Sequence, residues 1–270
     1  MSKIVALIQN LSLDITAGAL LSSAFICRVM NVPINTAMLV GLGIAIWLIY
    51  TVDHLLDARK VSGPATNPRH RFHQRYFKPI ALSALLLFVL GVYNATRLPI
   101  QTVKLGILLA GLSGMYFLYL ALSKSDRHKE FFAAVVYSAG VFTGPVSLLS
   151  SWDWAYLITF LQFFILASVN LMLLPVFEVE MDDSQQMSSI ALRQGKRALI
   201  IRALTLLFIN ALLIARGFFL NLNAYGQQDV FVAMTLVLQL MAWQPGWFAR
   251  GQRYRLAGDG IFLIPGLALL

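Results

Sequence analysis

Long apolar segments recur along the whole chain, and they constrain its fold more than any other feature. Each is close to the ~20 residues that an α-helix needs to cross a bilayer. Only 12% of the residues are charged, well below the share of about 25% in soluble domains. A soluble core could enclose one or two such segments, but not eight. The sequence therefore predicts an all-α, polytopic transmembrane helix bundle, with spans near residues 8–30, 36–58, 78–96, 100–122, 130–150, 154–177, 198–221 and 229–247.

The end of the chain leaves the number of spans open between eight and nine. Residues 259–270 are apolar but short for a crossing, and they contain Pro265. No linker or low-complexity tract divides the chain, so residues 1–270 are predicted to form a single domain. Its one cysteine, Cys27, excludes an internal disulfide and a multi-cysteine metal site.

Small residues recur at intervals of four in two of the predicted spans. One series is Gly106, Ala110 and Gly114, and the other is Gly140 and Gly144. In lipid, this spacing lets helix backbones approach closely. Both series are therefore predicted to lie at helix–helix contacts.

Basic residues alternate between the connections of the predicted spans. Most of the 21 lysines and arginines follow the second, fourth, sixth and eighth spans, whereas residues 32–35 and 98–99 on the opposite side contain none. The positive-inside rule then places the four basic connections and the N-terminus in the cytoplasm, and the chain in the inner membrane of a cell. Because this rule explains the formal net charge of +9, the charge does not indicate a nucleic-acid partner.

Two pairs of acidic residues stand at the cytoplasmic ends of spans. Asp53 and Asp57 end the second span, and Glu178 and Asp182 end the sixth. Residues four apart share a helix face, so each pair presents two carboxylates together. Like charges are costly there unless a cation lies between them. Arginine could supply that cation, and so could Mg²⁺, which binds carboxylates together with substrate phosphates.

The order of these motifs indicates an internal repeat. In each group of four spans, an acidic motif follows the second span and a basic turn follows the fourth. Two similar four-helix halves would bring both acidic motifs together over a central cavity. The basic side chains beside them, among them Arg59, Arg69, Arg71, Arg193 and Lys196, suit a diphosphate at the membrane surface.

These motifs resemble those of the UbiA-type intramembrane prenyltransferases. Asp53 and Asp57 match the aspartates of the family's Asn-x-x-x-Asp-x-x-x-Asp motif, and Glu178 and Asp182 occupy the acidic positions of its Asp-x-x-x-Asp motif. Residues 189–195, Ser-Ile-Ala-Leu-Arg-Gln-Gly, then align without a gap with a family stretch like Thr-Leu-Ala-Val-Arg-Leu-Gly. The close match is confined to about thirty positions.

Other positions extend the resemblance or depart from it. Tyr116, Tyr119 and Lys124 correspond to a tyrosine and a lysine near the end of the family's fourth helix. Ile49 stands where the first motif has asparagine, and Glu178 stands where the second has aspartate. The match is therefore to a divergent member of the family.

The resemblance implies a Mg²⁺-dependent enzyme that transfers a prenyl group from a polyprenyl diphosphate to a hydrophobic acceptor. Two Mg²⁺ ions would be held by Asp53, Asp57, Glu178 and Asp182, which are the implied catalytic and metal-binding residues. Loss of diphosphate would leave an allylic carbocation, which the acceptor attacks. The implied diphosphate-binding residues are Arg59, Arg69, Arg71, Lys124, Arg193 and Lys196.

Two other functions are compatible with the sequence. A catalytically degenerate relative would bind or transport an isoprenoid lipid, and the substitution at Ile49 favours it slightly. A membrane transferase for phospholipid head groups would need a longer helix motif rich in aspartate and glycine, which the chain lacks. The prenyltransferase is therefore the leading hypothesis.

Overall fold

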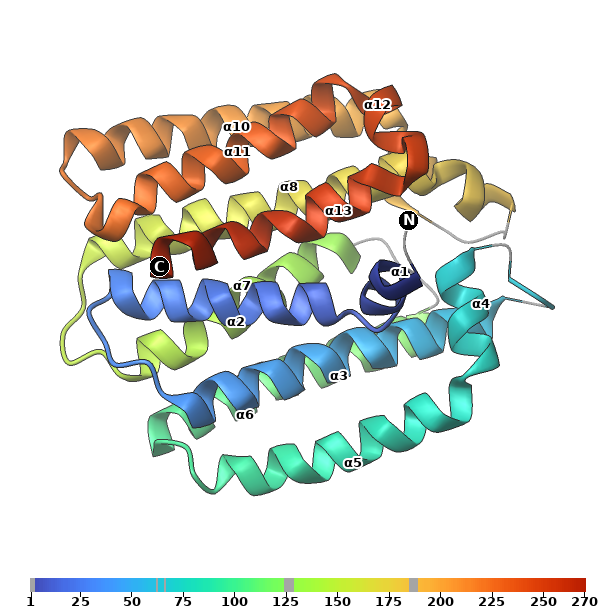
Figure 1. Cartoon of the computed structure of the whole chain (residues 1–270), viewed down its shortest axis with the longest axis horizontal. Coiled ribbons are helices and arrows are strands. Elements are labelled where there is room, and N and C mark those ends of the chain that lie inside the picture. Colours follow the sequence, from blue (N-terminus) through green and yellow to red (C-terminus); the bar gives the residue numbers. More distant parts are fainter. Residues whose placement is uncertain (1–2, 62, 66, 124–128, 185–188) are drawn as a thin grey trace.

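The computed structural model describes residues 3–61, 63–65, 67–123, 129–184 and 189–270. Every regular element within these ranges is helical, which confirms the predicted all-α class. The long helices lie side by side along the long axis of the molecule, and the two termini lie toward its opposite ends (Figure 1).

The helices follow the predicted apolar segments closely. In chain order they are α1 (Lys3–Asn10), α2 (Leu13–Val29), α3 (Thr36–Lys60), α4 (Pro68–Arg75), α5 (Phe77–Ala95), α6 (Ile100–Ser123), α7 (Lys129–Ser147), α8 (Trp154–Ser184), α9 (Ile190–Gln194), α10 (Lys196–Phe219), η1 (Ala224–Gly226), α11 (Gln227–Trp243), α12 (Pro245–Ala249), η2 (Arg250–Gln252), α13 (Arg253–Gly260) and η3 (Ile261–Leu269).

Five of these helices are long and apolar enough to cross a membrane: α3, α5, α6, α8 and α10. Two bent pairs raise the number among the described residues to as many as seven. They are α1 with α2, which meet at 69°, and 224–243 with 245–269, which meet at 94°. Such helices are compatible with an integral membrane protein.

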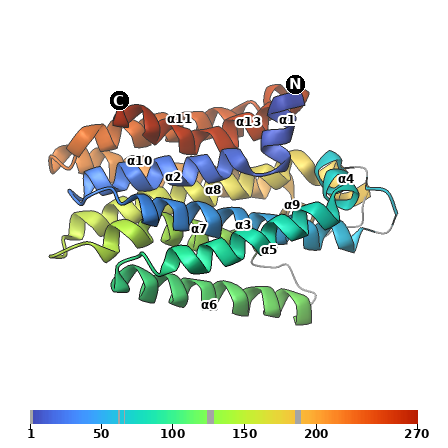
Figure 2. The ribbon, with the colours of Figure 1, turned by 60° about the horizontal axis from the view of Figure 1, so that its bottom comes forward.

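Helices α5 and α6 lie along one side of the bundle (Figure 2), and both expose large apolar side chains. Leu85 is 58% exposed, and Ile107 is 68% exposed. A soluble monomer rarely leaves a large contiguous apolar patch uncovered, so this side is suited to lipid.

The two series of small residues behave differently. A Cβ atom at Gly140 or Gly144 would be in van der Waals contact with Leu42 or Met38, so this part of α7 packs closely against α3. A Cβ atom at Gly106 or Gly114 would meet no atom of the described residues within 4 Å. The predicted helix contact at these two glycines is therefore wrong within the described part of the chain.

The C-terminal segment packs along α2 (Figure 1). A Cβ atom at Gly18 would lie 2.7 Å from the Cβ atom of Phe262, and one at Gly266 would lie 2.9 Å from Leu21. The Arg28 Nη1 atom donates a hydrogen bond to the carbonyl oxygen of Ala268 at 3.0 Å. Gly18 on α2 and Gly266 on η3 thus let the two helices approach closely. Because α13 directly precedes η3, this packing also holds α13 beside the other helices.

Helix α4 folds back onto the end of α3 because polar side chains hold the connection between them. The Asn67 side chain accepts a hydrogen bond from the Arg69 amide at 2.9 Å, and Pro68 occupies the first helical turn. The Gln74 amide nitrogen donates to the Ala58 carbonyl oxygen at 3.1 Å, and its oxygen accepts from the Ala65 amide at 3.0 Å. These contacts place the side chains of α4 above the end of the bundle.

Replacing Gly18 by alanine tests the close packing of η3 on α2. The new methyl group would overlap Phe262, and overpacking of this kind costs about 1–3 kcal/mol. We expect Gly18→Ala to lower the melting temperature of the detergent-purified protein, measured by intrinsic fluorescence. Gly106→Ala is the matched control, because its methyl group would meet open space. Equal melting temperatures for the two variants would contradict the packing.

Candidate functional site

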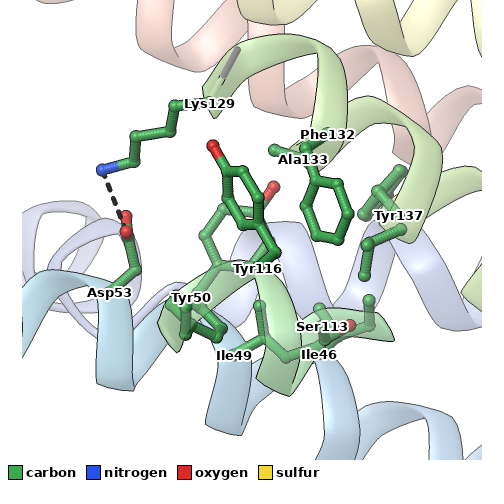
Figure 3. A pocket seen from close by; sticks show the side chains of 12 residues that line it. Ile46, Ile49, Tyr50, Asp53, Ser113, Tyr116, Lys129, Phe132, Ala133 and Tyr137 are labelled. Carbon is green, nitrogen blue, oxygen red and sulfur yellow. Dashed lines mark ion pairs between the residues drawn. The ribbon is translucent and has the colours of Figure 1, made fainter. Parts of the chain in front are cut away.

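The first acidic pair is neutralised by a lysine from another helix. Asp53 and Asp57 lie on α3, and the Lys129 Nζ atom at the start of α7 lies 2.9 Å from a carboxylate oxygen of each. Figure 3 shows Lys129 facing Asp53. Burial lowers the pKa of the Lys129 ammonium, but the two carboxylates outweigh this effect and raise it, so the group stays charged. The two carboxylates therefore converge on a single cation.

The second acidic motif receives its cation from the C-terminal part of the chain. The Arg255 Nη2 atom lies 2.6 Å from the Glu178 Oε1 atom, and the Tyr254 hydroxyl donates to the same oxygen at 3.1 Å. Both partners lie on α13, and Arg255 is 77 residues from Glu178 in sequence. Neither the lysine nor the arginine was assigned to these carboxylates from the sequence, because no local pattern connects segments so far apart.

The two motifs meet at one cavity, which we call the polar cavity. It has a volume of about 160 Å³, and both Asp53 and Glu178 line it. Asp182, one helical turn beyond Glu178, interacts electrostatically with Glu178, Asp57 and Lys129. Acidic residues more than 120 positions apart are thus brought to the same end of the bundle. The polar cavity is lined by Ile15, Tyr50, Asp53, His54, Arg69, Tyr137, Ala167, Asn170, Leu171, Leu174, Glu178, Arg255, Asp259 and Phe262.

Arg69 enters the polar cavity from α4. Its Nη1 atom lies 3.4 Å from the His54 Nε2 atom, and its carbonyl oxygen accepts a hydrogen bond from the His73 Nδ1 atom at 2.9 Å. The rings of His54 and His73 are in edge contact, with centroids 5.1 Å apart. Burial lowers the pKa of His73, and the charge of Arg69 lowers it further, so the ring is neutral at physiological pH. His70 and His73 are both buried.

Four of the other predicted diphosphate-binding residues lie away from the polar cavity, and the fifth lies outside the described residues. The Arg59 guanidinium is exposed and stacks over Phe77, and the Arg71 Nε atom donates to the Ala65 carbonyl oxygen at 2.8 Å. Lys196 forms an exposed ion pair with Glu180 at 3.5 Å. Arg193 is exposed, and Lys124 lies outside the described residues. Among the six, Arg69 is the one that the described lining of the polar cavity includes.

A second pocket, which is mainly apolar, adjoins the carboxylate of Asp53 (Figure 3). Its wall includes Ile49, the residue that replaces the motif asparagine, and it shares Tyr50, Asp53 and Tyr137 with the polar cavity. We call it the apolar pocket. Its lining residues are Ile46, Ile49, Tyr50, Asp53, Ser113, Tyr116, Phe117, Lys129, Phe132, Ala133, Val136 and Tyr137.

A third hollow, the distal pocket, lies further along α6 and α7, which also line the apolar pocket. It has a volume of about 320 Å³, and residues 105–112 of α6 and 139–146 of α7 contribute to its wall. The apolar pocket is lined by the preceding part of α7 and the following part of α6. From Ala133 to Val146 a helix rises ~20 Å, at ~1.5 Å per residue. The two hollows thus follow α6 and α7 away from Asp53, over a length that suits a lipid chain.

The first acidic pair fits a bound Mg²⁺ ion better than the second. Mg²⁺ is usually held by one or two carboxylates together with substrate phosphates. Asp53 and Asp57 meet this requirement, since their oxygens already converge on the Lys129 nitrogen. Glu178 is occupied by Arg255 and Tyr254. The described residues contain no group of three or more histidine, cysteine, aspartate or glutamate side chains placed to hold a metal alone, so the substrate would have to complete the coordination.

Comparisons of the chain with protein-family models, with curated proteins and with solved structures found no match.

Removing the Lys129 ammonium tests whether Asp53 and Asp57 are a cation site. The lysine gives up charged hydrogen bonds worth about 1.5 kcal/mol or more when a metal replaces it. We therefore expect Lys129→Met to bind Mn²⁺, used as a probe for Mg²⁺, roughly tenfold more tightly than the wild type. Electron paramagnetic resonance of free Mn²⁺ measures this affinity. Lys196→Met is the matched control, because it removes an exposed lysine paired with one carboxylate. An unchanged affinity in Lys129→Met would exclude a cation site at this pair.

Proposed function

We propose that the protein is a Mg²⁺-dependent prenyltransferase of the UbiA type, which transfers a prenyl group from a polyprenyl diphosphate to a hydrophobic acceptor within the membrane. One observation carries this proposal: carboxylates from two distant motifs line a single cavity, and the apolar pocket begins at one of them, Asp53. A lipid diphosphate has the matching shape, with a charged end and a long apolar chain.

The proposal assigns one task to the polar residues around Asp53 and another to the apolar walls of the apolar pocket and the distal pocket. The diphosphate end would lie beside Asp53, Asp57 and Lys129, with Arg69 facing it from α4. The prenyl chain would follow the apolar pocket and the distal pocket between α6 and α7. Burial of the chain there supplies binding free energy at about 25 cal/mol per Å² of apolar surface.

The chemistry divides between the metal and the protein. Bound Mg²⁺ would stabilise the negative charge that develops on the departing diphosphate. The Lys129 ammonium and the Arg69 guanidinium add positive charge close to that position. The apolar wall, which includes Ile49 and Phe132, limits the access of water to the prenyl carbon from which the diphosphate departs. Glu178 and Asp182 complete the proposed catalytic and metal-binding set.

The proposed membrane arrangement has eight or nine spans in two four-helix halves. Helix α7 supports this arrangement, because it packs alongside α8 and contributes to the walls of all three hollows. It does so although its first turn contains the charged residues Lys129 and Glu130. The basic connections after α3, α8 and α11 lie at one end of the bundle (Figure 1). The positive-inside rule would place this end, with the N-terminus and the active-site loops, in the cytoplasm, and the bundle in the inner membrane.

A degenerate relative that binds or transports an isoprenoid lipid is the second candidate. It is favoured by the ion pairs of the two motifs, because Lys129 and Arg255 already neutralise Asp53, Asp57 and Glu178. Such a protein would need the hollows but not the metal. It would bind a polyprenyl diphosphate equally well with Mg²⁺ or with EDTA and would release no diphosphate.

Loss of one motif carboxylate tests the enzyme directly. We expect the purified protein to release diphosphate from farnesyl, geranylgeranyl or longer polyprenyl diphosphates only with Mg²⁺. Asp53→Ala and Asp182→Ala should each reduce this rate by roughly a hundredfold or more, because each removes charge that positions the metal and diphosphate. A coupled assay for released diphosphate measures the rate.

The matched control is Glu180→Ala, which removes an exposed carboxylate from the same helix as Asp182. Its rate should equal that of the wild type. Circular dichroism and melting temperature establish that all three variants are folded. Release that persists in both aspartate variants would exclude the proposed enzyme, and EDTA-resistant binding without release would assign the protein to the second candidate.

A further inference from the structure

A sharp bend near the end of the chain places a short helix at the end of the bundle. Residues 224–243 and 245–269 meet at 94°, and α12 directly follows the bend. Phe248 on α12 is buried in the hydrophobic core, so the short helix is held against the bundle. In Figure 1, α12 lies at the same end of the bundle as α4. Its exposed side chains therefore stand where the long helices would meet a membrane surface.

The bend exposes two tryptophans. Trp243, the last residue of α11, is 63% exposed, and Trp247 on α12 is 50% exposed. Tryptophan is enriched at membrane–water interfaces, because its ring is apolar while its N–H group needs a polar partner. Two exposed tryptophans at a helix end thus indicate the level of the lipid head groups.

Two exposed arginines accompany these tryptophans. Arg250 and Arg253 directly follow α12. The Arg253 guanidinium carbon lies over the Trp247 ring, 4.3 Å from its centroid. This cation–π contact fixes the position of the guanidinium, and the N–H donors of a guanidinium form a planar fork that matches phosphate oxygens. The bend thus holds an arginine in place at the level of the head groups.

The described part of the protein supplies no counter-charge to these arginines. None of its carboxylates forms an ion pair with Arg250 or Arg253. Asp229 is the one acidic residue in the sequence between positions 190 and 258, and it stands in the first turn of α11, at the far end of that helix from the bend. Glu178 of α8 contacts α13, but Arg255 occupies it. The positive charge at the bend is therefore complementary to an anion from outside the chain.

An apolar stripe leads away from the bend along α11. Leu236, Leu240 and Trp243 are four and three residues apart, so they share one helix face, and all three are exposed. On α13, the exposed Leu256 stands three residues after Arg253, again on one face. The surface around the bend thus combines positive charge with exposed apolar side chains. This combination suits a lipid with an anionic head group, whereas a free phosphate ion would use only the charge.

We infer that this bend, through Arg250, Arg253, Trp243 and Trp247, binds the head group of an anionic glycerophospholipid. The two arginines donate to its phosphate oxygens, and the apolar stripe of α11 contacts an acyl chain. Basic side chains next to membrane-spanning helices attract anionic lipids in this way. The inference goes beyond the proposed function and does not depend on it, because these four residues are not part of the described lining of the three hollows.

Native mass spectrometry of the detergent-purified full-length protein tests the site, because this method counts bound lipids one by one. Dioleoylphosphatidylglycerol is the anionic probe. Dioleoylphosphatidylcholine has the same acyl chains without a net charge, and glycerol phosphate has the charge without the chains. We expect the first dioleoylphosphatidylglycerol molecule to bind roughly tenfold more tightly than dioleoylphosphatidylcholine, since each arginine near the head group contributes about fivefold. An excess of glycerol phosphate should not displace it.

Variants locate the binding at the bend. We expect Arg250→Gln and Arg253→Gln each to weaken binding of dioleoylphosphatidylglycerol roughly fivefold, and the double variant to weaken it roughly tenfold or more. Trp247→Leu should weaken it several-fold, because it removes the ring under Arg253 and keeps an apolar side chain. Arg75→Gln is the matched control, because Arg75 is an exposed arginine at the same end of the bundle and also stacks over an aromatic ring, that of Tyr76. Its affinity should equal that of the wild type.

Three outcomes would overturn the lipid site. Equal affinity for the two phospholipids would show that the apolar surface alone binds them. Displacement by glycerol phosphate would show a site for soluble phosphates instead. Unchanged affinity in the double arginine variant, or an equal loss in Arg75→Gln, would show that the binding does not lie at the bend. Selective lipid binding in a protein that releases no diphosphate would support the lipid site and reject only the prenyltransferase.

Discussion

Three motif carboxylates at this end of the bundle, those of Asp53, Asp57 and Glu178, each lie beside a cation. Removing a charge from water is expensive unless a partner lies close to it, and here the partners come from distant parts of the chain. Lys129 joins α7 to α3 through Asp53 and Asp57, and Arg255 joins α13 to α8 through Glu178. The same contacts that hold these helices together therefore define the polar end of the site. A metal ion that binds there must compete with cations that are already in place, whereas a diphosphate must compete with the carboxylates for those cations.

The site separates polar from apolar surface at a shared wall. Tyr50, Asp53 and Tyr137 stand between a cavity that contains arginines and carboxylates and a pocket that is almost entirely apolar. In the proposed enzyme, this wall would keep the charged diphosphate end and the apolar chain of the lipid in distinct environments. Helix α4 is essential to this division, because it carries Arg69 over the end of the bundle, where the contacts of Gln74 hold it.

Local patterns in the sequence predicted much of the fold and part of the site. Apolar segment length located the helices to within a few residues, as for α5 at Phe77–Ala95 and α10 at Lys196–Phe219. The four-residue spacing of Asp53 and Asp57 placed both carboxylates on one helix face, where they do contact the same nitrogen. The same reasoning was wrong for Gly106 and Gly114, because spacing alone does not say whether a helix face meets another helix or lipid.

The sequence by itself determined the all-α class, the helix positions and the gathering of acidic residues at helix ends, because each depends on residues within about twenty positions of one another. The tertiary structure decided which cation pairs with which carboxylate, which polar atoms are left unpaired and which arginine reaches the polar cavity. Lys129, Arg255 and Asn170 acquire their places from segments distant in sequence. Packing of whole helices brings such segments together, and no local pattern of residue types records that packing.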